Sequence, residues 1–203
     1  SQTIAAPYLE AFRHPYEALA GIRDYIISLG ATLPATEYDL IGENVWVARD
    51  ATVAASASIS GPCIVDSGAE VRHCAFIRGS AIVGKGAVVG NSTELKNVIL
   101  FNGVQVPHFN YIGDSILGYK AHFGAGVITT NVKSDKSLVV LNSGDERLET
   151  SRKKVGTMAG DFAEVGCNTA LCPGSVLGRN CIVYPVCRVD NAIASQNTAG
   201  AQG

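Results

Sequence analysis

Residues 59–95 read ISGPCI-VDSGAE-VRHCAF-IRGSAI-VGKGAV-VGNSTE-L, and every block of six opens on an aliphatic residue. The series extends back to Ile41, so that ten consecutive sixth positions are aliphatic. Neither an α-helix, with its period of about 3.6, nor a strand, with its period of about 2, requires a strict period of six. A coil of flat faces does require it, because each face repeats one inward aliphatic residue. The sequence therefore predicts a β-solenoid.

A second position in the repeat is small, as expected at a tight corner. The residue four places after each aliphatic anchor is, in turn, Val45, Ala51, Ala57, Cys63, Ala69, Ala75, Ala81, Ala87 and Thr93. Cys63, Cys181 and Cys187 occupy such positions, where cysteine serves as a compact apolar filler. No CxxC pair occurs, which argues against zinc and thioredoxin-like sites. We expect reduced thiols in a cytoplasmic protein.

Composition limits the classes of function. The 203 residues support one sizeable core, and 22 glycines with only 17% charged residues suit tight solenoid corners. A net charge of −2 offers no electrostatic basis for binding nucleic acid or an anionic membrane. No apolar run approaches the roughly 20 residues that span a bilayer. The first residues, Ser-Gln-Thr-Ile, predict no secretion signal.

Residues 1–37 predict an N-terminal helical cap. Apolar residues recur three and four positions apart between Tyr8 and Leu29, which is the one-sided stripe of an amphipathic helix. Pro15 interrupts the stripe and predicts a break between a short helix and a longer one. Gly30 is a suitable C-cap. We expect this segment to pack on the end of the solenoid, and binding to a partner is the alternative.

Residues 38–190 predict the solenoid, with two interruptions. The six-residue frame runs to about Leu100, slips around Phe101–Tyr111, which predicts a bulge or loop there, and resumes at Ile112 with a five-residue step to Leu117. A second stretch, at about 130–156, has no repeat and is rich in Lys, Asp, Ser and Glu. It predicts an irregular loop insertion that is functional or mobile. Residues 191–203 are small and polar and predict a flexible tail.

The repeat resembles the left-handed parallel β-helix of the hexapeptide-repeat family across residues 41–190. In that family three hexads form one triangular coil, and only the resemblance implies the left hand, since crossovers are usually right-handed. Such proteins are mostly homotrimers with active sites between neighbouring prisms, and many are acyltransferases that use acetyl-CoA. The resemblance therefore implies an all-β fold, a homotrimer and acetyl-CoA as co-substrate.

A narrower resemblance rests on three stretches, VGNSTELK at 89–96, PHFNYIGD at 107–114 and FGAG at 123–126, with SRKKVG at 151–156 and LCPG at 171–174. They resemble the acetyltransferase domain of bifunctional sugar-1-phosphate nucleotidyltransferase/acetyltransferases, which make UDP-N-acetylglucosamine, and the last two are similar to its archaeal-type branch. These residues carry no nucleotidyltransferase signature. The resemblance is therefore to the acyltransferase domain alone, and a separate nucleotidyltransferase is a candidate partner.

The resemblance implies an N-acetyltransferase that acts on an amino-sugar phosphate of the glucosamine-1-phosphate or galactosamine-1-phosphate type. The attacking amine must lose a proton, and a histidine with a pKa near neutrality is the usual base. The family's base falls on His108, and the frame slip predicts that this side chain points into the groove. A hydrogen-bonded groove histidine without catalytic role is the alternative. Ala125 falls where the family holds the developing oxyanion with a backbone N–H.

The sugar-phosphate ligands of the family fall on Arg78, Lys96 and Tyr111. Arginine and lysine suit a phosphate, which accepts charge-assisted hydrogen bonds. Solvated surface charges are the alternative, because most Lys and Arg side chains are exposed. His122 stands where the family has an asparagine that contacts the sugar, and this departure leaves the identity of the sugar open.

The coenzyme site of the family falls on Asn131, with Lys136 and Cys167 as further predicted contacts. The aromatic residue that usually follows the asparagine is Val132 here. Basic residues of the insertion are predicted to meet the coenzyme's phosphates, and an ordinary solvated loop is the alternative. These residues are Lys133, Lys136, Arg152, Lys153 and Lys154.

Two other functions stay open. One branch of this fold is a zinc carbonic anhydrase with three histidine ligands, for which His73, His108 and His122 are candidates. That family has two ligands in a His-x-x-x-x-His pair, whereas His108 and His122 are fourteen residues apart, so we expect no metal. The other function is non-catalytic, a scaffold or nucleotide-sugar-binding protein with a degenerate site.

Overall fold

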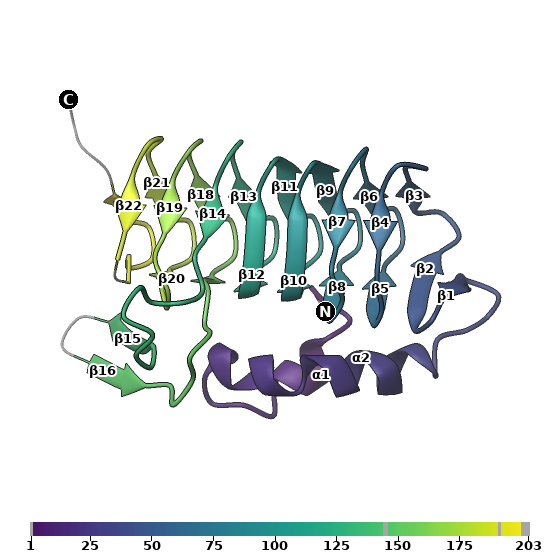
Figure 1. The fold of residues 1–203 in the computed structure, drawn as a ribbon, viewed down its shortest axis with the longest axis horizontal. Coiled ribbons are helices and arrows are strands. Elements are labelled where there is room, and N and C mark those ends of the chain that lie inside the picture. The colour runs from purple at the N-terminus through teal and green to yellow at the C-terminus, as the bar shows by residue number, and fades with distance from the viewer. Residues whose placement is uncertain (1, 144–145, 191, 200–203) are drawn as a thin grey trace.

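The chain forms a parallel β-solenoid with a helical segment along one side (Figure 1). The computed structural model describes residues 2–143, 146–190 and 192–199. The predicted class, an all-β solenoid with a short N-terminal helical region, is confirmed. None of the helices in these ranges is long and apolar enough to cross a bilayer.

The strands stack into three faces. Face one contains β2 (Val45–Ala48), β5 (Cys63–Val65), β8 (Ala81–Val83), β17 (Met158–Ala159), β20 (Val176–Leu177) and the second halves of β10 (Glu94–Leu100) and β12 (Tyr111–Leu117). Face two contains β3 (Thr52–Val53), β6 (Glu70–Val71), β9 (Val88–Asn91), β11 (Gln105–His108), β13 (His122–Phe123), β18 (Glu164–Val165), β21 (Ile182–Val183) and β23 (Thr198–Ala199). Face three contains β4 (Ser58–Ile59), β7 (Phe76–Ile77), β14 (Ile128–Thr129), β19 (Ala170–Leu171), β22 (Arg188–Val189) and the first halves of β10 and β12.

The inward residues form one apolar column. Parallel pairing sets Val65 beside Val83, and Val83 beside Leu100, on face one. All three are fully buried, as are Val89 on face two and Leu95 on face three. Removing this aliphatic surface from water is the main favourable term in folding. The predicted repeat is thus the core of the molecule.

The first predicted anchor is wrong. Ile41 is 59% exposed and belongs to β1 (Tyr38–Gly42), which pairs antiparallel with β2. The chain reverses at Asn44, whose φ of 55° is in the left-handed region. Because the hairpin folds outside the first coil, the inward series begins at Val47 and not at Ile41.

The frame slip predicted around Phe101–Tyr111 is wrong, whereas the five-residue step from Ile112 to Leu117 is confirmed. Val106 is fully buried, so the six-residue frame from Leu100 to Ile112 is regular. The five-residue steps are Leu95 to Leu100 and Ile112 to Leu117, at the corner between faces three and one. There the short corner lets a seven-residue strand continue from one face to the next, in β10 and again in β12.

The helical segment lies along a side of the solenoid and does not cap its end (Figure 1). It contains α1 (Ala6–Leu9), the 3₁₀ helix η1 (Pro15–Ala20) and α2 (Ile22–Gly30), with the break before Pro15 that the sequence predicts. The outward residues of face one are apolar and pack against the helices; they are Ile64, Ile82, Ile99, Ile116 and Met158. Such a face must be covered because leaving it in water loses the hydrophobic gain. The predicted cap is therefore a side cover.

Two further stretches contain structure that the sequence analysis did not predict. The insertion includes an antiparallel hairpin of β15 (Val140–Ser143) and β16 (Glu146–Glu149), whose Leu141 packs with the helical segment's cluster. In the predicted tail, β23 pairs in parallel with β21, so the described residues 192–199 add to the solenoid. The expectation of flexibility for residues 191 and 200–203 lies outside the described residues.

Truncating an isoleucine beneath the helices tests the side cover. Ile82→Ala removes a fully buried side chain, so we expect a loss of about 2–4 kcal/mol in the free energy of unfolding. Ile128→Ala, at an outward position of face three that is 42% exposed, is the matched control and is expected to lose less than about 1 kcal/mol. Urea unfolding of both variants measures the difference. Equal losses would mean that the helices do not cover face one in solution.

Candidate active site

The corner between faces two and three carries the predicted catalytic residues. The His108 carbonyl accepts a hydrogen bond from the Gly126 N–H at 3.1 Å. The Ala125 carbonyl, one coil further along, accepts from the Asn168 N–H at 2.8 Å. We call the stacked corner residues the His108 row; they are His73, Asn91, His108, Ala125 and Cys167. The structure therefore brings His108, Ala125 and Cys167 onto one edge of the prism.

A buried asparagine fixes the backbone at His108. Asn110 is 2% exposed, its Oδ1 accepts the His108 N–H at 3.1 Å, and its Nδ2 donates to the Gly124 carbonyl at 2.8 Å. The His108 side chain itself is exposed, with its ring centroid 6.0 Å from that of Phe109. No described residue hydrogen-bonds to the imidazole, so the ring is open to a substrate amine while its backbone is held in place.

The backbone N–H of Ala125 is available as a donor. Residue 125 lies outside the strands and is half-buried, and no acceptor for its N–H occurs among the described residues. Its two neighbours donate elsewhere, Gly124 to the Val165 carbonyl at 2.7 Å and Gly126 to His108. An oriented N–H without a partner beside an accessible imidazole is the arrangement that stabilises a developing oxyanion.

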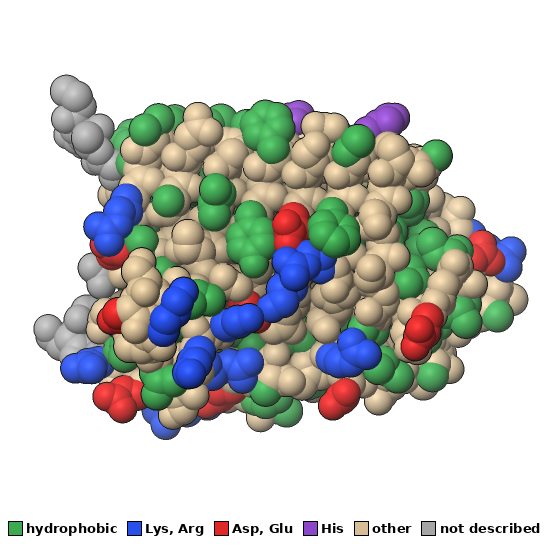
Figure 2. Space-filling model, in the orientation of Figure 1, with side chains coloured by type: hydrophobic (Ala, Val, Ile, Leu, Met, Phe, Trp, Pro, Cys, Tyr) green, Lys and Arg blue, Asp and Glu red, His purple; other side chains and the backbone are tan. Residues whose placement is uncertain are grey.

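Face three carries a mixed patch of aromatic, acidic and basic side chains, visible in the middle of the face shown in Figure 2. The parallel register sets Phe76, Glu94 and Tyr111 beside one another on successive coils. Arg78 Nη1 lies 2.7 Å from Glu94 Oε1, and both side chains stay partly exposed, at 45% and 32%. The predicted phosphate ligand Arg78 thus has a carboxylate partner in the folded chain.

A buried carboxylate organises the corner between faces three and one. The Asp114 side chain is only 5% exposed, and its Oδ1 accepts from Asn97 Nδ2 at 2.8 Å. Its Oδ2 accepts from Asn131 Nδ2 at 2.5 Å and lies 3.8 Å from Lys96 Nζ. Asn131 Nδ2 is also 3.4 Å from the Tyr111 hydroxyl. We call Lys96, Asn97, Tyr111, Asp114 and Asn131 the Asp114 cluster.

The Tyr111 phenol oxygen accepts from Asn131 Nδ2 in this cluster, and the phenol keeps its own proton. Burial, together with the charges of Asp114 and Glu94, raises the pKa of Tyr111 above its ordinary value. A raised pKa means that the phenol keeps its proton at neutral and mildly alkaline pH. Tyr111 can therefore donate to an anionic ligand on face three.

Two predicted residues lie apart from the Asp114 cluster. His122 is on face two, where its Nδ1 lies 2.9 Å from Glu164 Oε2. His122 pairs with Gln105, the first residue of β11, and His108 is the last residue of that strand. Lys136 is exposed in a turn of the insertion, with a left-handed φ of 59° and its N–H bonded to the Lys133 carbonyl.

A groove of about 530 Å³ lies where the insertion meets face three. Its wall on the insertion side includes Thr130, Val132 and Lys133, and its wall on the solenoid side includes Cys172 and Arg188. Lys133 and Arg188 thus place one cation on each side of the hollow, and Arg188 Nη2 lies 2.6 Å from Oδ2 of Asp190, which also lines it. His108 is exposed and Tyr111 is half-buried, and neither of them lines this groove.

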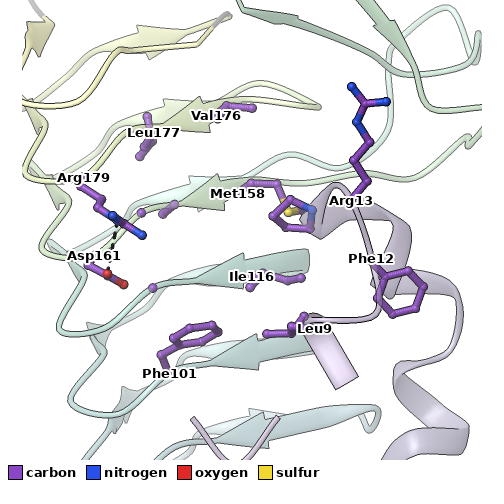
Figure 3. Close-up of a pocket in the computed structure, with 14 residues that line it drawn as sticks. Leu9, Phe12, Arg13, Phe101, Ile116, Met158, Asp161, Val176, Leu177 and Arg179 are labelled. Atoms are coloured by element: carbon purple, nitrogen blue, oxygen red, sulfur yellow. Dashed lines mark ion pairs between the residues drawn. The ribbon is translucent and has the colours of Figure 1, made fainter. Parts of the chain in front are cut away.

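A second cavity, of about 390 Å³, lies on face one between the helical segment and the last coils (Figure 3). Phe12, Ile116, Met158 and Val176 give it an apolar lining, and the Arg179–Asp161 ion pair stands at its side. None of the predicted site residues lines it, so it is separate from the candidate active site.

The histidines do not assemble a metal site in the described part of the chain. Within those residues no group of three or more His, Cys, Asp or Glu side chains is placed to hold a metal ion. His73 lies two coils away from His108 in the row, and His122 is engaged with Glu164 on face two.

Glu94 and Asp114 are functional candidates to which the sequence analysis gave no role, although both stand inside the quoted motifs. The signal was a carboxylate close to an inward aliphatic residue in a chain with few charges: Glu94 directly precedes Leu95, and Asp114 lies within the short step from Ile112 to Leu117. Arg188 of the groove was also missed, and it stands at the outward position before the inward Val189. Outward neighbours of anchors are the positions that the faces display.

Known proteins match the middle of the chain. Residues 59–143 match the family described as GMPPB C-terminal domain. The chain is 36% identical over 105 residues to "Bifunctional protein GlmU" of Methanocaldococcus jannaschii, which covers 52% of this chain and 26% of that protein. It is 32% identical over 94 residues to the "Bifunctional sugar-1-phosphate nucleotidylyltransferase/acetyltransferase" of Sulfurisphaera tokodaii, over 46% of this chain and 23% of that one.

These matches confirm the resemblance predicted from the motifs. The chain spans only about a quarter of the length of these relatives. Among solved structures, the acetyltransferase domain of PglB from Neisseria gonorrhoeae FA1090 in complex with acetyl coenzyme A aligns with 76% of this chain and 56% of that chain. It does so at 18% identity and a TM-score of 0.34.

Thiol reactivity tests the geometry of the corners. Cys63 and Cys181 are fully buried, and burial raises their pKa values to about 12 and about 11, whereas Cys74 and Cys167 are exposed. Because the thiolate is the reactive form, we expect iodoacetamide at pH 8 to modify Cys74 and Cys167 and to spare Cys63 and Cys181. Peptide mass spectrometry of the native protein gives the order, and urea-unfolded protein is the control. Early modification of Cys63 would contradict the packing.

Proposed function

We propose that the chain is an acetyl-CoA-dependent N-acetyltransferase that acts on an amino-sugar phosphate, of the glucosamine-1-phosphate or galactosamine-1-phosphate type. The observation that carries the proposal is the accessible imidazole of His108 one coil from the free N–H of Ala125. The similarity to the bifunctional nucleotidyltransferase/acetyltransferases supports it. All three motifs around these residues lie within residues 59–143, which match the family described as GMPPB C-terminal domain.

The chemistry needs a base and an oxyanion donor. His108 takes a proton from the amine as the nitrogen attacks the thioester carbonyl of acetyl-CoA. The carbonyl oxygen gains negative charge and is stabilised by the Ala125 N–H. When the carbonyl re-forms, the carbon–sulfur bond breaks, and the coenzyme A thiolate receives the proton from His108. The amide and coenzyme A are the products, and no covalent enzyme intermediate forms.

The sugar phosphate binds at face three in this proposal. Arg78 and Lys96 lie beside carboxylates, and a partly exposed ion pair such as Arg78–Glu94 contributes only about 0–1 kcal/mol. A phosphate dianion can therefore take the place of Glu94 at Arg78 without a large penalty, and it accepts stronger charge-assisted hydrogen bonds. Tyr111 adds a neutral donor. His122, on face two, is then left to contact the sugar near His108.

The coenzyme occupies the groove between the insertion and face three in this proposal. Lys133 and Arg188 on its two walls suit phosphate groups, and Asn131 stands between two residues that line it. Lys136 lies further out on the same loop, where it can reach a phosphate in solvent. Cys167, in the His108 row, borders the path from the groove to the reacting carbonyl.

Two copies are required to enclose the reactants. His108 and Asp114 stand at opposite edges of face three, six residues apart, which is at most about 20 Å at roughly 3.3 Å per residue. Within one chain His108 is on an open edge, and a second prism against that edge would exclude water. We therefore propose a homotrimer with sites between copies, and a separate nucleotidyltransferase as the enzyme that uses the product.

The test is release of free coenzyme A from acetyl-CoA with either amino-sugar phosphate as acceptor. His108→Ala is expected to lower kcat by roughly a hundredfold or more, because general base catalysis contributes about that much. His73→Ala is the matched control, since it removes another histidine of the same row two coils away, and it is expected to leave kcat unchanged.

Turnover that His108→Ala leaves unaffected would exclude His108 as the base. Tight binding of a nucleotide sugar with no turnover on any amino-sugar phosphate would contradict the proposal and favour the scaffold or sensing alternative.

A further inference from the structure

We propose that Asp114 is a positioning residue that holds Lys96 and Asn131 in the geometry required by the two substrates. This inference rests on the proposed function and deepens it, because it assigns a role to a residue that touches neither reacting group. Asp114 combines three properties that rarely occur together: a charge, near-complete burial, and contact with two predicted ligands.

The contacts of Asp114 fit a carboxylate, and they do not fit a neutral side chain of the same shape. Its two oxygens face two amide nitrogens, of Asn97 and Asn131, and a lysine ammonium stands 3.8 Å away. A buried carboxylate is tolerated only when such donors satisfy it. Each donor in turn is fixed by the carboxylate, so the position of Asp114 sets the positions of Lys96 and Asn131.

Asp114 also ties down the insertion that forms the groove. The Asp114 carbonyl accepts the Gly156 N–H at 2.8 Å, and the Asn131 carbonyl accepts the Val155 N–H at 3.0 Å. The two ends of the insertion are therefore held at one corner. Thr130 and Val132 line the groove on either side of Asn131. A shift of Asp114 would therefore change both the coenzyme groove and the phosphate site at Lys96.

The shortened corner explains why an aspartate fits there. The five-residue step turns the chain with Asp114 in the left-handed region, at a φ of 48°, and Asn97 does the same one coil earlier, at 55°. Asp and Asn tolerate this conformation better than other residues with side chains. Asn97 Nδ2 additionally lies 3.2 Å from the Leu19 carbonyl, which links the cluster to the helical segment.

Replacing the carboxylate of Asp114 with an amide changes the contacts of Asn131 and Lys96. In Asp114→Asn, one side-chain oxygen becomes an NH₂ group that faces another donor. Asn97 keeps the Leu19 carbonyl as an acceptor, so Asn131 is the residue that must rotate or move away from Tyr111. Lys96 also loses its neighbouring negative charge. We therefore expect poorer substrate placement in a chain that remains folded.

Kinetics separate positioning from a general loss of stability. We expect Asp114→Asn to raise KM for the amino-sugar phosphate about tenfold with kcat changed less than about threefold, and to affect an unphosphorylated amino sugar much less. Asp66→Asn is the matched control, because Asp66 is a fully buried aspartate at a corner of the solenoid remote from these contacts. Combined with Lys96→Gln, Asp114→Asn should add little further loss, because the two act through one contact.

A second measurement does not depend on turnover. An N-hydroxysuccinimide acetate reagent should modify Lys96, now 30% exposed, several-fold faster in Asp114→Asn than in the unmodified sequence. Hydrogen exchange at residues 155–156 should accelerate as well, and Asp66→Asn should change neither readout. If these changes occur but the protein acetylates no amino sugar, the proposed function fails and the positioning of Lys96 stands.

The opposite pattern overturns the inference. Turnover on an amino-sugar phosphate with KM, Lys96 labelling and exchange all unchanged in Asp114→Asn would show that Asp114 positions nothing. If that variant does not fold, Asn97→Gly gives the same test, because glycine accepts the φ of 55° while the amide that holds Asp114 Oδ1 is removed. It should raise KM in the same direction by a smaller factor, and an unchanged KM would again contradict the proposal.

Discussion

The whole structure depends on parallel stacking in register, which sets each position of the chain beside its counterpart one coil later. This pairing makes one column of inward aliphatic residues, and it also makes columns of outward residues at the faces and corners. The His108 row is such a column, held by backbone hydrogen bonds from coil to coil. Chemistry on this fold is therefore built from residues that are about one coil apart in sequence and adjacent in space.

The three faces have different neighbours, and this difference leaves only part of the prism for ligands. Face one is apolar on its outside and is occupied by the helical segment. Face three displays charged and aromatic side chains, and the insertion lies beside it and forms a groove lined by Lys133, Arg188 and Asp190. The shortened corner joins these two faces and carries Asp114, so the helices, the insertion and the charged face all meet at one buried carboxylate.

The fold class could be predicted from the sequence, because it follows from the repeat. The short contiguous motifs supplied the candidate site residues, whose roles stay predictions. Val65, Val83 and Val89 are core residues as predicted. The side location of the helices was missed, although Ile64 and Ile82 already showed an apolar outward position at each coil of one face. The prediction used only the inward residues of the repeat and not the outward ones.

The partners of the predicted ligands could not be predicted in the same way. The Arg78–Glu94 pair and the Asp114–Asn131 contact each join residues from successive coils, and the Asp114–Asn131 contact also spans the five-residue corner from Ile112 to Leu117. The sequence analysis placed the slip at Phe101–Tyr111, which would have shifted every contact between those coils. Predicting which side chains pair in a solenoid thus requires the corner lengths, whereas predicting the fold requires only the repeat.

A crystal structure with coenzyme A and glucosamine-1-phosphate bound would test the central claim most directly. The account predicts the sugar amine within about 2.6–3.2 Å of the His108 imidazole, the phosphate at Arg78 and Lys96, and the coenzyme's sulfur near the Ala125 N–H. Binding of both ligands away from the His108 row, for example in the cavity beside Met158, would contradict it.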